Sequence, residues 1–214
     1  KAIIPVHYAG IPCAMSEILT IAEQHGLLVI EDAAHAIGAE YAGAKIGNLP
    51  SAATCFSFYA TKNLTTGEGG ALATNNEKFA ARVRSLSLHG ITKDAWSRYG
   101  AQADWRYDLN AIGFKYNLTD IQAALGIRQL SKLDAMNARR AALCAAYQEQ
   151  LQDIDGVTML DHECANGRSA YHLAVARFDP RYTGIRDQAA RVLRDAGVGV
   201  SVHFIPVCAF GHMQ

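Results

Sequence analysis

Runs of apolar residues separated by polar turns recur along the chain, and they predict an alternation of strands and helices. Residues 27–30 form a continuous apolar run, which is typical of a strand buried on both faces. Before it, residues 14–25 place apolar side chains on one helical face and end at Gly26, a common helix stop. Residues 3–7 predict a strand ahead of that helix. This strand–helix–strand order predicts a parallel sheet with a right-handed crossover.

The rest of the pattern continues this alternation and predicts two domains in an α/β fold. Residues 1–130 are expected to form the larger domain and residues 131–214 a small α+β domain. Further strands are predicted at residues 54–58, 71–73, 171–178 and 198–202, with a hairpin around residues 42–43. Further helices are predicted at residues 77–88, 119–130, 131–151 and 183–197, with Asn76, Thr119 and Thr183 as expected N-caps.

Residues 89–110 are polar and aromatic and follow no clear period. They carry the aromatic residues Trp96, Tyr99, Trp105 and Tyr107. A long aromatic loop in a compact domain is typical of a binding or lid segment, and a plain surface loop is the alternative.

One lysine stands at the mouth of the strand predicted at residues 54–58. Lys62 lies in the polar loop after that strand, and Gly67, Gly69 and Gly70 then permit tight turns and close approach of a ligand. Partial desolvation lowers the pKa of an amine, and a neutral amine is a nucleophile that can condense with an aldehyde. An ordinary solvated loop lysine is the alternative.

An acidic residue stands at the end of the other buried strand. Glu31 and Asp32 follow the apolar run, and small residues and His35 come next. Because α/β proteins place chemistry where parallel strands end, one strand end here offers a carboxylate and another offers an amine. A pyridoxal phosphate (PLP) site needs this pair, a lysine for the Schiff base and an acid facing the pyridinium nitrogen. The spacing by itself indicates only a possible PLP site.

Four motifs carry a family resemblance. They are Glu-Asp-Ala-Ala-His-Ala from residue 31, Phe-Ser-Phe-Tyr-Ala-Thr-Lys-Asn-Leu from 56, Gly-Glu-Gly-Gly from 67 and Phe-Lys-Tyr-Asn-Leu-Thr-Asp from 114. In this order and at this length they resemble the DegT/StrS family of nucleotide-sugar aminotransferases over nearly the whole chain. The chain is similar in particular to the branch that aminates position 4 of UDP-linked keto sugars, such as the 4-amino-4-deoxy-L-arabinose enzyme.

The resemblance implies an aspartate-aminotransferase-like fold (fold type I), with a mostly parallel sheet flanked by helices and PLP as cofactor. It implies a transaminase that moves the amino group of glutamate to a nucleotide-linked, UDP-bearing 4-keto sugar and releases 2-oxoglutarate. It also implies a homodimer with shared active sites. A sugar dehydratase of the same family and a non-catalytic PLP-binding regulator are the alternatives. The dehydratases carry histidine where this chain has Lys62, and the sequence contains no basic helix-turn-helix pattern of a regulator.

Roles at the cofactor also follow from the resemblance. Lys62 is implied as the Schiff-base lysine and then as the general base that moves the proton. Asp32 is implied as the partner of the ring nitrogen, with a helix N-cap as its alternative role. His35 is placed near the ring hydroxyl and Ser57 at the phosphate. Their alternatives are a core histidine and a strand serine whose hydroxyl bonds to the backbone.

Further roles concern the neighbouring subunit and the substrate. The resemblance places Asn117 at the phosphate of the neighbouring subunit's cofactor, although an asparagine just before Thr119 could also cap a helix. Lys115 and Tyr116 share this motif and are expected at the sugar nucleotide. His203 is expected there too, with a surface histidine as its alternative.

The composition limits the expected binding partners and the expected cellular location of the protein. Twenty basic and twenty acidic residues cancel, so no general attraction to nucleic acid or membrane is expected. Five widely spaced cysteines without a Cys-x-x-Cys motif predict neither a disulfide nor a zinc framework, and the cytoplasm is the expected location. No run of membrane-spanning length or signal peptide stands out. Because the sequence opens at Lys1 inside a strand pattern, we expect an internal fragment whose N-terminal part is absent.

Overall fold

The chain forms two compact units in the computed structural model, which describes residues 1–91, 107–182 and 184–213. Unit 1 comprises Lys1–Tyr147 and Asp161–Val175, and unit 2 comprises Gln148–Leu160 and Ala176–Gln214. The chain therefore returns to unit 1 for fifteen residues before it enters unit 2 again. The predicted boundary between residues 130 and 131 stays a prediction. Thr183 and most of the predicted aromatic loop lie outside the described residues.

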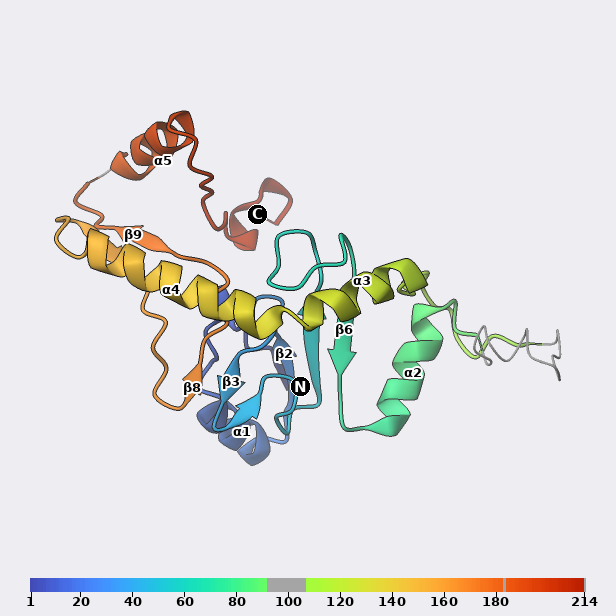
Figure 1. The fold of residues 1–214 in the computed structure, drawn as a ribbon. Helices are drawn as coiled ribbons and strands as arrows, with labels where there is room; N and C mark the ends of the chain where they lie inside the picture. The colour runs from blue at the N-terminus through green and yellow to red at the C-terminus, as the bar shows by residue number, and fades with distance from the viewer. Residues whose placement is uncertain (92–106, 183, 214) are drawn as a thin grey trace. The chain divides into compact units, whose positions relative to one another are not determined.

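The sheet of unit 1 confirms the predicted α/β order. Its strands are β1 (Ala2–Ile3), β2 (Leu28–Asp32), β5 (Ala53–Ser57) and β6 (Gly70–Ala73), in the order β1-β2-β5-β6 (Figure 1). The first three run parallel, and β6 is antiparallel to β5. Helix α1 (Met15–Gln24) forms the crossover between β1 and β2, and the chain passes through Gly26 before β2 starts. Strand β1 is shorter than predicted, and an isolated bridge joins Val6 to Asp32.

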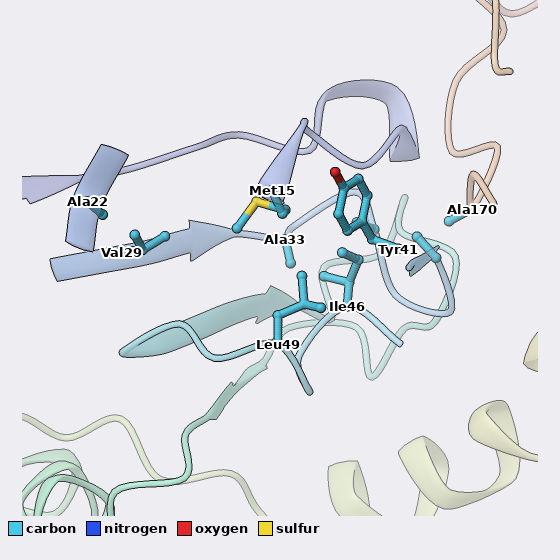
Figure 2. Packing of buried hydrophobic residues seen from close by; sticks show 10 residues of the cluster. Met15, Ala22, Val29, Ala33, Tyr41, Ile46, Leu49 and Ala170 are labelled. Carbon is cyan, nitrogen blue, oxygen red and sulfur yellow. The ribbon is translucent and has the colours of Figure 1, made fainter. Parts of the chain in front are cut away.

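Small and apolar side chains fill the core beside β2. Met15 of α1 is fully buried, and Val29 of β2 and Ala33 are nearly so. Figure 2 shows Met15 and Ala33 close to Tyr41 and Ile46, which follow β2 in the chain. Burying a side chain such as Met15 contributes about 1.5–3 kcal/mol. The core therefore fixes the end of β2, where the predicted carboxylate stands.

The predicted hairpin is confirmed and gains a third strand. Strands β3 (Glu40–Tyr41) and β4 (Ala44–Lys45) pair in antiparallel fashion, and β8 (Gly167–Arg168) pairs with β3. Glu40 bonds both Lys45 and Arg168 at 2.8 Å. The segment Asp161–Val175 is thus joined to the rest of unit 1 by backbone pairing as well as by side chains.

Three predicted helices of unit 1 are confirmed. Helix α2 (Glu77–Ser87) starts at Asn76, whose side chain accepts a hydrogen bond from the amide of Phe79. Helix α3 (Asp120–Leu130) starts with a capping box between Thr119 and Gln122, and α4 (Leu133–Leu151) follows it. The local sequence decides where α2 and α3 start, because a capping side chain satisfies backbone amides that have no partner inside the helix.

Unit 2 contains the strand pair β7 (Val157–Met159) and β9 (Ala176–Phe178) and helix α5 (Ile185–Asp195). Two predictions here are wrong. The strand predicted at 171–178 exists only as β9, because the backbone of residues 170 and 172 bonds to residues 9 and 10 instead. The alternating residues 198–202 form no strand in the described structure, and Val198 and Val202 are 41% and 48% exposed.

Short 3-10 helices complete the described elements. They are η1 (Tyr8–Gly10) in unit 1, and η3 (Val207–Ala209) and η4 (Gly211–Met213) in unit 2. Among the helices in the described ranges, none is both long and apolar enough to cross a membrane.

Candidate active site

The ends of β2 and β5 bring the predicted carboxylate and amine together. Asp32 is the last residue of β2 and pairs with Cys55 of β5, and the chain reaches Lys62 soon after β5 ends. Lys62 is partly buried, and this burial lowers the pKa of its amine, while the charge of Asp32 acts in the opposite direction. The carboxylate is therefore close enough to act on the lysine. Both groups stand at the edge of the sheet where α/β proteins place chemistry.

Asp32 is held by its own turn and by the strand next to it. Its Oδ1 accepts a hydrogen bond from the amide of Ala34 at 3.1 Å. Its amide donates to the carbonyl of Pro5 at 2.9 Å, and its carbonyl accepts from the amide of His7 at 3.1 Å. The chain then continues to β3, so Asp32 caps no helix. The N-cap alternative is excluded.

The loop that carries Lys62 is anchored on both sides of the lysine. The Lys62 amide donates to the carbonyl of Tyr59 at 3.0 Å, and the amide of Thr66 returns to the carbonyl of Phe58 at 2.9 Å. The next two residues, Asn63 and Leu64, are only 4% and 3% exposed. The lysine thus projects from a loop whose backbone has little freedom to move.

Asn63 is a buried residue that the sequence analysis gave no role. Its Nδ2 donates to the carbonyl of Ala170 and to Oδ1 of Asn137, both at 2.7 Å. Because both amide hydrogens are used in this way, its Oδ1 must accept, and it does so from Nδ1 of His172 at 2.7 Å. Asn137 lies on α4, and its Nδ2 donates to the carbonyl of Ile37 at 3.2 Å. Asn63, Asn137 and His172 are all buried; we call these three residues the amide network.

His35 lies against this network, in the turn that follows Asp32. Its ring centroid is 4.3 Å from that of His172 and 6.0 Å from that of Tyr8. Its Nδ1 accepts the amide hydrogen of Ala9 at 3.3 Å. The structure therefore gives His35 a packing role, and its contact with a cofactor ring stays a prediction.

Ser57 ends β5 opposite Gly70 of β6. Its Oγ accepts the amide hydrogen of Tyr59 at 3.3 Å, as expected for a serine satisfied by the backbone. That contact uses an acceptor lone pair, so the hydroxyl hydrogen remains available to a phosphate oxygen. The phosphate role of Ser57 stays a prediction.

Gly69 lies in the turn that leads into β6, as the sequence predicts, and Gly70 is the first residue of that strand. Gly69 has φ 147°, and a side chain there would meet Oγ1 of Thr66 at 2.6 Å. A Cβ on Gly70 would lie 2.6 Å from the carbonyl oxygen of Phe56. Only glycine fits both positions without a shift of the backbone beside the lysine loop.

Lys115, Tyr116 and Asn117 belong to a second region of unit 1. Tyr116 and Asn117 line a groove of about 760 Å³ together with residues of β6, α2 and α3. The amine of Lys115 donates to Oδ1 of Asn117, and Tyr116 is 74% exposed. Thr119, and not Asn117, caps α3. The cap alternative for Asn117 is therefore excluded, and the roles of the three residues stay predictions.

His203 belongs to unit 2, where its ring packs against Phe204 at a centroid distance of 3.8 Å. Its expected contact with the substrate stays a prediction.

A buried carboxylate behind the site also escaped the sequence analysis, although it belongs to the motif at residue 31. Glu31 is fully buried, as is His7, whose Nε2 lies 2.8 Å from Oε2 of Glu31. Nδ1 of His7 accepts the amide hydrogen of Cys13, so Nε2 carries the hydrogen and donates to Glu31. Thr54 of β5 donates to Oε1 at 2.7 Å. A charged residue inside an apolar strand was the signal that could have found this cluster.

The donor set at the strand ends fits PLP. The cofactor requires an amine to attach its aldehyde, an anion at its ring nitrogen and hydrogen-bond donors for its phosphate. Lys62 supplies an amine with a lowered pKa, and Asp32 supplies a carboxylate within electrostatic reach of it. Ser57 at the end of β5 supplies a hydroxyl. These three residues are the ones that would hold the cofactor.

Comparison with known proteins also points to an aminotransferase that uses PLP. The sequence model described as the DegT/DnrJ/EryC1/StrS aminotransferase family matches residues 1–213. The spore coat polysaccharide biosynthesis protein SpsC of Bacillus subtilis is 47% identical over 210 residues, which are 97% of this chain and 53% of that protein. The chain spans about half the length of the curated relatives it matches.

Solved structures agree with the sequence comparison. Spr1654 of Streptococcus pneumoniae, in its PMP form, superposes with a TM-score of 0.89 at 30% identity, over 99% of this chain and 58% of that one. A PLP form of the same protein also matches. PseC of Helicobacter pylori, an aminotransferase involved in the biosynthesis of pseudoaminic acid, has a TM-score of 0.89 at 28% identity, over 100% of this chain and 55% of that one. The predicted fold class is confirmed.

Proposed function

Because this chain belongs to the DegT/DnrJ/EryC1/StrS aminotransferase family, we propose that it provides the catalytic lysine of a PLP-dependent sugar aminotransferase. The observation that carries the proposal is that Lys62, in the loop after β5, lies within electrostatic reach of Asp32 at the end of the parallel strand β2. A solvated loop lysine would keep its usual pKa, whereas the pKa of Lys62 is lowered by burial. The presence of lysine, and not histidine, at this position favours transamination over dehydration.

Lys62, Asp32 and Ser57 have different roles in the proposed reaction. PLP, when bound, supplies the electron sink and carries the amino group between the two substrates. Lys62 is the covalent anchor, and as a free amine it accepts and returns the proton at the carbon that exchanges nitrogen. Asp32 holds a negative charge where the ring nitrogen is expected, which keeps that nitrogen protonated. Ser57 is placed to donate to the phosphate.

The substrates follow in the same proposal. Glutamate is the amino donor and 2-oxoglutarate its product, and a nucleotide-linked, UDP-bearing 4-keto sugar receives the amine. The similarity to SpsC, a spore coat polysaccharide biosynthesis protein, and to PseC, an aminotransferase involved in the biosynthesis of pseudoaminic acid, supports a sugar substrate. Lys115, Tyr116 and His203 would bind the sugar nucleotide. Asn117 would serve the cofactor of a second subunit in a cytoplasmic homodimer.

The lysine assignment is tested by trapping. Borohydride reduction of the PLP-loaded protein should fix the cofactor on Lys62, and peptide mass mapping identifies the labelled residue. Lys62→Ala should bind PLP only loosely and lose turnover, because the covalent anchor and the proton acceptor disappear together. Label on another lysine would contradict the assignment. Turnover with glutamate and a panel of UDP- and dTDP-keto sugars then identifies the acceptor.

A further inference from the structure

A buried asparagine directly follows the lysine of the proposed site. Surface loops rarely bury a polar side chain unless its hydrogen bonds are satisfied, and Asn63 uses both amide hydrogens and its oxygen. Its partners come from distant parts of the sequence, with Asn137 separated by 74 residues and His172 by 109. The folded chain therefore holds the Asn63 side chain in a specific buried site formed by Asn137, Ala170 and His172, which we call the socket.

The same socket reaches the loop that follows Asp32. Asn137 donates to the carbonyl of Ile37, and the ring of His172 packs on the ring of His35. Residues 35 and 37 both follow Asp32 within the turn between β2 and β3. Two separate routes thus connect the lysine loop to the carboxylate loop, one through α4 and one through the segment Asp161–Val175.

Close packing keeps both routes short. A Cβ on Gly38 would lie 2.7 Å from Nδ2 of Asn137, so only glycine lets α4 approach this turn so closely. The amides of Ala170 and His172 donate to the carbonyls of Gly10 and Ala9 at 2.9 Å, which fixes the second route at η1. Rigid contacts of this kind transmit a displacement instead of absorbing it.

We propose that Asn63 is a positioning residue for Lys62, and that its amide sets how deeply the lysine amine is buried and how it faces Asp32. The inference rests on the proposed function of Lys62. Asn63 itself touches no reacting atom in this proposal. Removing its amide would leave the Ala170 carbonyl, Oδ1 of Asn137 and Nδ1 of His172 without this partner inside the protein. The loop would then open to let water reach these groups, and the amine of Lys62 would gain water with them.

The test measures the lysine directly. In the protein without PLP, the rate at which trinitrobenzenesulfonate modifies Lys62 is followed against pH by peptide mass spectrometry. Because burial lowers the pKa of Lys62, opening the loop in Asn63→Ala should raise that pKa. Each unit of increase lowers the fraction of reactive neutral amine about tenfold at a fixed pH below the pKa. In the PLP-loaded protein, the pH midpoint of the cofactor's visible absorbance should move relative to the unchanged protein.

The matched control is Asn76→Ala. It removes one asparagine side chain that caps α2 and makes no contact in the amide network, so the pH profile of Lys62 should not change. An equal profile in folded Asn63→Ala and in the unchanged protein would overturn the proposal. If Asn63→Ala fails to fold, Asn137→Ala provides the test. It removes one of the three hydrogen bonds of the Asn63 side chain, so the pKa of Lys62 should rise, but by less than in Asn63→Ala. An unchanged profile there overturns the proposal too.

Trapping with borohydride and the pH dependence of Lys62 modification test different properties of the protein. If borohydride labels a different lysine, the proposed function of Lys62 fails, while the pH profile of Lys62 without PLP still reports on Asn63. If Lys62 is labelled but its profile ignores the amide network, only the positioning role fails.

Discussion

Replacing Glu31 by glutamine tests whether the buried carboxylate behind the site is a structural anchor. Glu31 accepts one hydrogen bond from Nε2 of His7 at 2.8 Å and one from Oγ1 of Thr54 at 2.7 Å, and it is fully buried. Hydrogen bonds to a charged group contribute about 1.5–3 kcal/mol each, and neutral ones about 0.5–1.5 kcal/mol. In the variant, Nε2 of His7 can donate to the amide oxygen, and the Thr54 hydroxyl must turn to accept from the amide NH2. Two hydrogen bonds to a charged group then become two neutral ones, which costs about 2–3 kcal/mol. The neutral amide loses less solvation on burial, so we expect a net loss of about 2 kcal/mol at pH 7.

The loss should depend on pH in a defined direction. Burial by itself raises the pKa of Glu31, but the hydrogen bonds from His7 and Thr54 outweigh it, and the pKa lies below its usual value. The stability that the ionised carboxylate contributes is fully present above its unfolded pKa of about 4.3. It disappears as the pH falls through the lower folded pKa. The difference between the unchanged protein and Glu31→Gln should therefore shrink in acid.

Urea unfolding followed by circular dichroism measures this, at pH 7 and at the lowest pH where both proteins fold. Glu40→Gln is the matched control, since Glu40 also bonds two side chains, but these are Lys45 and Arg168, which are about half exposed. Exposed ion pairs contribute about 0–1 kcal/mol, so the control should lose less than Glu31→Gln. The reasoning is refuted if both variants lose the same stability at pH 7, or if the loss in Glu31→Gln stays constant into acid.

Two further predictions concern the proposed reaction. Asp32→Asn keeps the shape and removes the charge, so kcat should fall far more than the affinity for PLP, as steady-state kinetics and a PLP titration will measure; near-normal kcat would remove Asp32 from the ring nitrogen. Mixing Lys62→Ala with Asn117→Ala subunits should restore one intact site in each mixed dimer. Absence of recovered turnover, after mass spectrometry confirms subunit exchange, would argue against a site shared between subunits.

The sequence predicted the parts of this fold that depend on local pattern. The buried run that became β2, the amphipathic face of α1 and the caps at Asn76 and Thr119 all act over a few residues. That Lys62 and Asp32 lie near each other was predictable too, because the carboxyl ends of parallel strands meet at one edge of the sheet. Their roles at a cofactor stay predictions.

The failures come from contacts that no local pattern reveals. Of the strand predicted at 171–178, only residues 176–178 form a strand. The backbone amides of residues 170 and 172 bond instead to η1, which is far away in the sequence. The alternation at 198–202 has strand character, but an alternating segment needs a neighbour to pair with. Asn63 was passed over because its partners are 74 to 109 residues away and only the folded chain brings them together.

The discontinuity of unit 1 matters for anyone who wants to shorten this protein. A chain cut after Tyr147 would contain Lys62 and Asp32 but would lack Ala170 and His172, two of the three groups that bind Asn63. Unit 1 therefore cannot be produced by one truncation. A chain that ends at Val175 would contain all of unit 1, but it would also carry Gln148–Leu160, in which β7 has lost its partner strand β9. Natural insertions and deletions should be tolerated more readily at residues 152–156, between α4 and β7, than within Asp161–Val175.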